Sequence, residues 1–346
     1  MSTPGSAPRT PVSALGERGL IDRIRDRLPT PAAGVLVGIG DDAAVFEPER
    51  GALQILTTDA LVEGIHFDRR FSSPADIGYK ALAVNASDVA AMGGRPTHAL
   101  VSLMLPDNLP VCDVDGLIDG LAELARVARV SVIGGNVTRS PGPLVVDVTL
   151  AGTVRRRRVL TRSGGRPGQA LYVTGALGAG SAGLGWLQAH ASDPSDVPDD
   201  AELAECVRRY RRPVPRGRVG GILGGTRAAA VCMDLSDGLG DAVRQVAERS
   251  GTGARLETAR LPVAAGARRW FESRGLDPVV AAVSGGDDYE LLFAVDGRRR
   301  GRLRTVLQQA RGVPVTRIGE LTADPGLYLV RPDGGTVDLP RGFAHF

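Results

Sequence analysis

Residues 72–94 read SSPADIGYKALAVNASDVAAMGG, and this stretch predicts the helix around which the N-terminal half of the chain is built. Ser73 is a typical helix cap, Pro74 suits the first helical position, and the glycine pair at 93–94 ends the helix. Because its body is rich in alanine, we expect this helix to pack closely against a sheet.

Around this helix, apolar runs with strand and helix periodicity alternate, which is typical of a mixed α/β fold. In the first half we expect helices at 14–28 and 114–127, and strands at 34–39, 53–57, 97–105, 130–133 and 144–150. In the second half we expect strands at 170–173, 229–233, 289–295, 315–318 and 327–330, and helices at 181–190, 201–211, 238–249 and 300–311.

The chain is long enough for more than one domain. Its 346 residues allow about two domains, at roughly 150 residues each. An arginine run and a turn-rich segment near 151–168 indicate the boundary. We therefore expect a disordered, proline-rich tail at 1–13, an N-terminal α/β domain at 14–152 and a C-terminal α/β domain at 153–346.

The composition is that of an ordinary globular protein, with 43% hydrophobic and 23% charged residues. No apolar run of about 18 residues is present, so we expect no membrane span. The three cysteines, Cys112, Cys206 and Cys232, are scattered and odd in number. This pattern argues against a disulfide framework or a zinc site and favours the cytoplasm.

The net charge of +3 raises the question of nucleic-acid binding. The arginines are spread along the chain, and aromatic residues that could stack on bases make up only 4%. We therefore expect no nucleic-acid partner. The run at 155–158 could bind phosphate, but a solvated strand end is the favoured interpretation. Lys80 is the only lysine, and we expect it at the surface without a role.

Acidic, amide and hydroxyl side chains recur at the expected ends of strands. They are Asp41, Asp42, Thr57, Thr58, Asp59, Asn136, Asp234, Ser236 and Asp237. Taken singly, several could be helix caps or turn residues. Asp88 resists that interpretation, because it lies inside the alanine-rich helix on an apolar face, where an unpaired carboxylate is costly.

Oxygen ligands without histidine or cysteine partners are typical of hard cations, above all Mg²⁺, which commonly bridges to phosphate oxygens. The usual nucleotide motifs are absent, since the only lysine follows Tyr79 and no Walker A loop or protein-kinase catalytic loop occurs. Any ATP would be held through metal ions, backbone amides and arginine.

Seven motifs, in this order, resemble the thiamine-monophosphate kinase family of the aminoimidazole ribonucleotide synthetase and selenophosphate synthetase superfamily. They are GIGDDAAVF, TTDALVEGIHF, YKALAVNASDVAAMGGRP, IGGN, LTRSG, DLSDGL and SGGDDYEL. The resemblance covers roughly residues 14–346, and the closing GFAHF also looks like the family's end. It implies an N-terminal domain whose strands pair across a homodimer, and phosphorylation of thiamine monophosphate by ATP.

The resemblance also implies roles for individual residues. Several Mg²⁺ ions would be held by Asp42, Thr57, Thr58, Asp59, Asp88, Asn136, Asp234 and Asp237. ATP would contact Gly135, Asn136, Arg162 and Ser236. Thiamine monophosphate would contact His66, Asp287 and Phe343, although His66 could instead pack in a loop and Phe343 could fill a core.

Two positions depart from the family pattern. Asn136 stands where an aspartate is common, so one metal should bind more weakly, and Asp287 stands where a longer glutamate is common. Since the acceptor phosphate is already ionised, we expect direct in-line transfer without a strong base or a phosphoenzyme. Another ATPase of the superfamily and a non-catalytic nucleotide- or metal-binding protein remain the alternatives.

Overall fold

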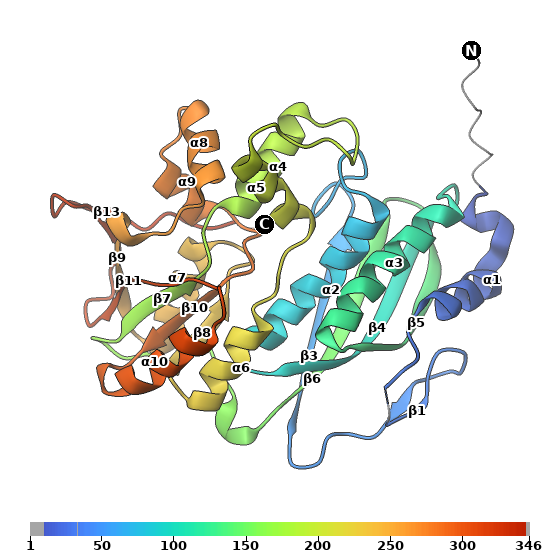
Figure 1. Ribbon diagram of the computed structural model, residues 1–346, viewed down its shortest axis with the longest axis horizontal. Coiled ribbons are helices and arrows are strands. Elements are labelled where there is room, and N and C mark those ends of the chain that lie inside the picture. Colours follow the sequence, from blue (N-terminus) through green and yellow to red (C-terminus); the bar gives the residue numbers. More distant parts are fainter. Residues whose placement is uncertain (1–9, 33, 344–346) are drawn as a thin grey trace.

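The computed structural model describes residues 10–32 and 34–343, which form a mixed α/β fold on two main sheets. The first sheet has the strand order β3-β6-β4-β5, and only β4 and β5 are parallel. Helices α2 and α3 cover one of its faces (Figure 1). The bounds are β3 Leu53–Val62, β4 Arg95–Pro106, β5 Ser131–Ser140, β6 Val145–Val154, α2 Pro74–Ala91 and α3 Val111–Ala128. The predicted α/β class is confirmed.

Helix α2 begins and ends where the sequence indicates. Ser73 and Asp76 form a reciprocal capping box, and Gly93 follows the last turn with a φ of 71°. The close approach of α2 to α3 depends on glycine, because a Cβ added to Gly78 would lie 1.8 Å from the carbonyl oxygen of Leu117. The helix is buried along most of its length, between α3, the first sheet and the second half of the chain.

Several strands are longer than the sequence-based prediction, and for two of them the difference changes where site residues point. Strand β3 does not end at Thr57 but continues to Val62, so Thr57, Thr58 and Asp59 are strand residues. Strand β5 likewise runs through Asn136 to Ser140. Side chains alternate between the two faces of a strand, so neighbouring residues in these motifs point in opposite directions.

Residues 10–13 are ordered, contrary to the expectation. Helix α1, Val12–Arg27, begins within the expected tail, Val12 is buried, and its amide donates to the carbonyl of Leu109 at 2.8 Å. The prediction of disorder is therefore wrong for residues 10–13, and residues 1–9 lie outside the described part. Strands β1, Val35–Val37, and β2, Val45–Phe46, flank the loop that carries Asp41 and Asp42.

The second half forms a sheet with the order β13-β12-β9-β11-β7-β10-β8. Its strands are β7 Ala170–Thr174, β8 Ala229–Asp234, β9 Gly253–Glu257, β10 Leu291–Val295, β11 Val315–Thr322, β12 Leu327–Val330 and β13 Thr336–Asp338. Its helices are α4 Ala179–His190, α5 Ala201–Arg211, α6 Gly217–Thr226, α7 Leu239–Ser250, α8 Ala265–Ser273, α9 Pro278–Ser284 and α10 Arg300–Gln309. Strand β10 is buried on both faces, since Leu292 and Phe293 belong to separate apolar cores.

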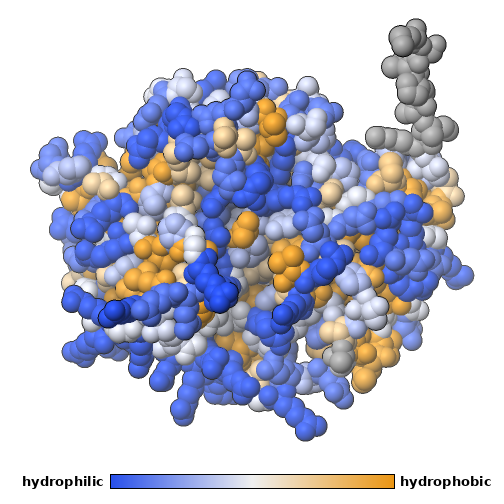
Figure 2. All heavy atoms as spheres, viewed as in Figure 1, coloured by the Kyte–Doolittle hydropathy of each residue, from blue (hydrophilic) through white to orange (hydrophobic). Residues whose placement is uncertain are grey.

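The sequence-based prediction does not include β2, α6, β9, α8, α9 and β13. The surface over α6 and α10 is largely hydrophilic (Figure 2). The arginines at 155–158 are all exposed, as expected for a solvated segment. Among the described residues, no helix combines the length and the apolar character that crossing a bilayer requires.

Candidate functional site

A pocket of about 480 Å³ lies where the two halves of the chain meet, beside α2 and the ends of β8 and β10. It gathers eight of the expected site residues: Asp59, His66, Asp88, Asp234, Ser236, Asp237, Asp287 and Phe343. Among the described residues of the lining, Arg341 is the only basic one apart from His66. The pocket therefore brings five aspartates from both halves of the chain around a space with little positive charge.

The acidic end of the pocket is built on β3 and α2. Thr57 donates its hydroxyl proton to Asp88 at 2.5 Å, and Asp59 lies on the same face of β3 as Thr57. Burial, followed by the negative charges of Asp88, Asp147 and Asp237, raises the pKa of Asp59 to about 7. Burial also raises the pKa of Asp88. Asp59 and Asp88 are thus close enough for their negative charges to repel each other when both are ionised.

Asp234 adds a third carboxyl group from the second half. It is the last residue of β8, and Ser87 on α2 donates to it at 2.8 Å. Burial, with the charge of Asp88 as the next cause, raises the pKa of Asp234 to about 7. Arg162 acts in the opposite direction, since its charge lowers the pKa values of both Asp88 and Asp234. The expected ATP ligand Arg162 is thus on the acidic side, where its guanidinium donates to Gln245 at 2.7 Å.

The other end of the pocket contains the three residues expected to contact the substrate. The ring nitrogen Nδ1 of His66 accepts a hydrogen bond from the amide of Val62 at 3.0 Å, so a neutral His66 carries its proton on Nε2. Phe343 is half exposed, which excludes the alternative in which it fills a core, and its amide donates to the carbonyl of Asp237. Asp287 accepts hydrogen bonds from Lys80 at 3.1 Å and from Tyr289 at 2.9 Å.

Lys80 is not the surface residue that we expected. Its side chain is only 3% exposed and lies against the pocket wall, where it reaches the carboxylate of Asp287. Lysine is almost never buried without a charged or polar partner. A single sequence does not show that Asp287 lies beside Lys80 in the fold, so the burial of Lys80 could not be predicted. The only signal available was the position of Lys80 on the buried alanine-rich helix, eight residues before Asp88.

Thr58, Gly135 and Asn136 do not join this pocket. Thr58 faces away from α2 and donates to Asp147 at 3.0 Å on the open face of the sheet. Asn136 lies on β5, at the opposite edge of the sheet from β3, and is exposed. Three strand spacings of about 4.8 Å separate these two edges. The expected metal ligands therefore fall into more than one group.

Asp42 also lies outside the pocket lining. Its loop is next to β5. A Cβ added to Gly38 would lie 3.8 Å from the carbonyl oxygen of Ile133, and a Cβ added to Gly134 would lie 3.9 Å from the Cβ of Ala44. Asp42 is thus closer in the fold to the Gly135–Asn136 group than the sequence indicates. The expected metal ligands are separated into groups because side chains alternate between the two faces of β3 and because β5 continues past Asn136.

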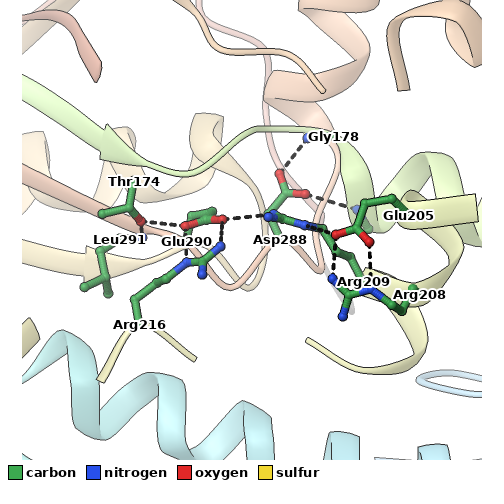
Figure 3. A network of polar contacts seen from close by, with 10 residues as sticks. Thr174, Gly178, Glu205, Arg208, Arg209, Arg216, Asp288, Glu290 and Leu291 are labelled. Atoms are coloured by element: carbon green, nitrogen blue, oxygen red, sulfur yellow. Dashed lines mark hydrogen bonds and ion pairs between the residues drawn. The ribbon is translucent and has the colours of Figure 1, made fainter. Parts of the chain in front are cut away.

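Sequence reasoning also missed a polar network behind the pocket, formed by the second half of the SGGDDYEL motif (Figure 3). Glu290 is fully buried and accepts hydrogen bonds from Arg209, Arg216 and Thr174. Asp288 accepts from the amides of Gly178 and Gly180 at 2.7 and 3.1 Å. The motif therefore directs Asp287 into the pocket while its next acidic residues anchor the loop from behind.

Two family models match the chain. The model for AIR synthase related protein, N-terminal domain, matches residues 40–154, and that for AIR synthase related protein, C-terminal domain, matches residues 166–331. The fold and the shared pocket thus define a two-part protein of the AIR synthase related class.

More specific relatives narrow this class. Thiamine-monophosphate kinase from Escherichia coli (strain K12) is 41% identical over 339 residues, which covers 96% of this chain and 99% of the relative. The crystal structure of thiamine-monophosphate kinase from Stenotrophomonas maltophilia K279a has a TM-score of 0.80 and 35% identity, covering 92% of this chain and 96% of its own. A structure described as AaThiL complexed with AMPPCP and TMP has a TM-score of 0.74 and 32% identity, covering 98% and 100%. The chain belongs to the thiamine-monophosphate kinase family, as the motifs indicated.

Proposed function

We propose that this chain transfers the γ-phosphoryl group of ATP to thiamine monophosphate, giving ADP and thiamine diphosphate. The observation that carries the proposal is the pocket shared by both halves, with an acidic end at Asp59 and Asp88 and a second end at His66 and Asp287. The relative complexed with AMPPCP and TMP supports the same pair of ligands.

We infer that several Mg²⁺ ions supply the positive charge that the pocket lacks. Asp59, Asp88, Asp234 and Asp237 would hold them, and the donor set fits, since these are crowded carboxylates with little basic compensation. Within the described residues, no three carboxylate, histidine or cysteine side chains form a ready-made metal site. This suits Mg²⁺, which is usually bound by one or two carboxylates together with substrate phosphates. Bound magnesium would supply positive charge that stabilises the phosphates and the transferred group.

The chain's own residues would mainly position the two substrates. Arg162 lies on the acidic side and Ser236 lines the pocket, and both would contact ATP, while His66, Asp287 and Phe343 would contact thiamine monophosphate. Of the lining residues that the structure describes, none combines a nucleophilic side chain with an adjacent base, which favours direct transfer between substrates. A phosphorylated protein on the turnover path, detected by intact mass, would contradict direct transfer.

We also propose that two copies of the chain pair through the open face of the first sheet. Leu56 is 74% exposed and Leu100 is 41% exposed, and the strand register places both on the face opposite α2. Exposed apolar side chains on a sheet face are typical of an interface. Thr58 and Asn136 share this face, so any ligand that they hold would lie where the copies meet.

The compartment that we propose is the cytoplasm. Cys206 and Cys232 are buried free thiols and Cys112 is an exposed one, a state that a reducing compartment preserves.

The direct test is to incubate the protein with Mg-ATP and thiamine monophosphate and to measure thiamine diphosphate by chromatography. We expect product from the wild type and at least about a 100-fold lower rate from Asp88→Asn, as for the loss of one preorganised electrostatic group. Asp26→Asn removes the same charge from an exposed helix position and should leave the rate unchanged. If the wild type forms no product while an authentic kinase does so in parallel, the proposed function is wrong.

A further inference from the structure

The single lysine of this chain occupies a buried position. The chain has 42 lysine and arginine residues, and all but Lys80 are arginine. The sequence therefore uses arginine for every other basic side chain, including those in the buried network around Glu290. Lys80 is 3% exposed, on the pocket-facing side of α2. This is the one position at which the chain has an ammonium group instead of a guanidinium.

The surroundings of Lys80 suit an ammonium group. Its Nζ lies 3.1 Å from Oδ2 of Asp287, 3.2 Å from the carbonyl oxygen of His66 and 4.0 Å from the centre of the Tyr210 ring. An ammonium has three N–H donors around one point, which match a carboxylate, a carbonyl and an aromatic face. A guanidinium is larger and planar, with its donors in a fixed fork, and does not match three such partners converging on one point.

These three partners come from separate parts of the fold. His66 lies in the loop before α2, Tyr210 lies on α5, and Asp287 lies in the loop before β10. The hydroxyl of Tyr210 also donates to the His66 carbonyl, at 3.3 Å. Lys80 thus joins the two loops that carry the expected substrate contacts, one from each half of the chain.

The loop that carries Asp287 needs such a constraint. Asp287 and Tyr289 have φ angles of 65° and 49°, a left-handed conformation that non-glycine residues keep only when their surroundings fix it. From behind, the Asp288 and Glu290 network fixes the loop (Figure 3). From the front, Lys80 holds one carboxylate oxygen of Asp287 and Tyr289 holds the other.

We propose that Lys80 is a positioning residue that sets the Asp287 carboxylate and the His66 loop for the phosphate-ester substrate. The compact geometry of its ammonium group, and not its charge alone, provides this function. The inference rests on the proposed function, because it assigns Lys80 to the thiamine monophosphate end of the pocket.

Steady-state kinetics of Lys80→Arg and Lys80→Met test the proposal. In both variants we expect the KM for thiamine monophosphate to rise at least about tenfold, since an orienting contact to the partly buried carboxylate of Asp287 is lost. The KM for ATP should stay within about twofold, because Lys80 is on the far side of the pocket from Asp88, about 12 Å along α2 at 1.5 Å per residue. Arg70→Met, which removes an exposed cation just before the same helix, is the matched control and should change neither constant.

A spectroscopic readout separates positioning from general stability. Because lysine occurs once, protein labelled with ¹⁵N-lysine gives one side-chain signal, from Nζ of Lys80. We expect thiamine monophosphate to shift this signal in the wild type and to leave it unshifted in Asp287→Asn. This measurement uses the wild type and Asp287→Asn and does not depend on whether the lysine variants fold.

Two outcomes would overturn the proposal while the wild type still forms thiamine diphosphate. One is a KM for thiamine monophosphate in Lys80→Met that equals the wild-type value. The other is a wild-type KM in Lys80→Arg, which would show that charge alone suffices. An inactive wild type would instead reject the proposed function itself, so the two failures are distinguishable.

Discussion

The crowding of carboxyl groups in the pocket predicts an unusual dependence of stability on pH in metal-free protein. Asp234 is 2% exposed, and its pKa is raised to about 7 from the ordinary value of 3.8. The folded chain therefore keeps a proton that the unfolded chain has already released. The stability gained from this proton is complete below pH 3.8 and is lost as the pH rises through about 7.

The size of the effect follows from that shift. Each pH unit in which only the folded state holds this proton changes the free energy of unfolding by about 1.4 kcal/mol. Between pH 5.5 and 8.0 Asp234 therefore lowers the free energy of unfolding by about 2 kcal/mol. The unfolding entropy of a chain of this length is on the order of 0.7 kcal/mol per degree, so the melting temperature should fall by about 3 °C.

Asp234→Asn isolates this contribution, because asparagine keeps the shape and the hydrogen bond from Ser87 but does not titrate. Thermal unfolding of both proteins in EDTA at pH 5.5 and 8.0 gives the comparison. We expect the variant to gain about 3 °C relative to the wild type between the two pH values. Taking the difference cancels titrating groups that do not interact with Asp234, such as His98, whose pKa burial lowers.

Parallel melting curves for the two proteins, or a relative gain by the wild type at pH 8.0, would show that Asp234 is not protonated and would refute the reasoning. Added Mg²⁺ gives a second check. Because protons compete with the metal for carboxylates, Mg²⁺ should raise the melting temperature of the wild type more at pH 8.0 than at pH 5.5.

Three further predictions concern the scaffold. Leu56→Glu should convert a dimer into monomers in sedimentation velocity, because it places a charge on the exposed sheet face; an unchanged dimer mass would place the interface elsewhere. Gly120→Ala should lower the melting temperature by several degrees, since the added Cβ would lie 1.9 Å from the carbonyl oxygen of Ala75 on the facing helix. Arg216→Met should cost about 3–5 kcal/mol in urea unfolding, because Glu290 would lose one of its two arginine partners while fully buried; a cost below about 1 kcal/mol would contradict this.

The sequence was most informative where local chemistry and fold agree. The cap, the proline and the glycines of α2 predicted its bounds to within a few residues, because those signals act on the backbone nearby. Asp88 could be singled out as functional since a carboxylate inside an apolar helix face has no capping role. The structure places it next to Thr57 and Asp59, and its functional role stays a prediction.

The prediction failed where tertiary contacts override local signals. Helix α6 has the sequence GRVGGILGGT, and its glycines argue against a helix when read alone. At Gly220 the missing side chain allows α6 to pack closely on α2, since a Cβ there would be 2.0 Å from the carbonyl oxygen of Ala90. Thr57 and Thr58 were grouped because β3 was expected to end there, and only its continuation to Val62 separates them onto opposite faces. Lys80 was missed because its partners come from remote segments.

Helix α2 sets the distance between the two ends of the pocket. Lys80, Ser87 and Asp88 are spaced so that they lie on one face of the helix, and each contacts a residue from another segment. Two of those partners, Asp287 and Asp234, belong to the second half of the chain. The separation between the acidic end of the pocket and the Asp287 end is therefore fixed by about two turns of one rigid helix. Because glycines on α3 and α6 allow those helices to pack directly on its backbone, α2 has little freedom to slide, and the two halves share one fixed reference for binding two substrates.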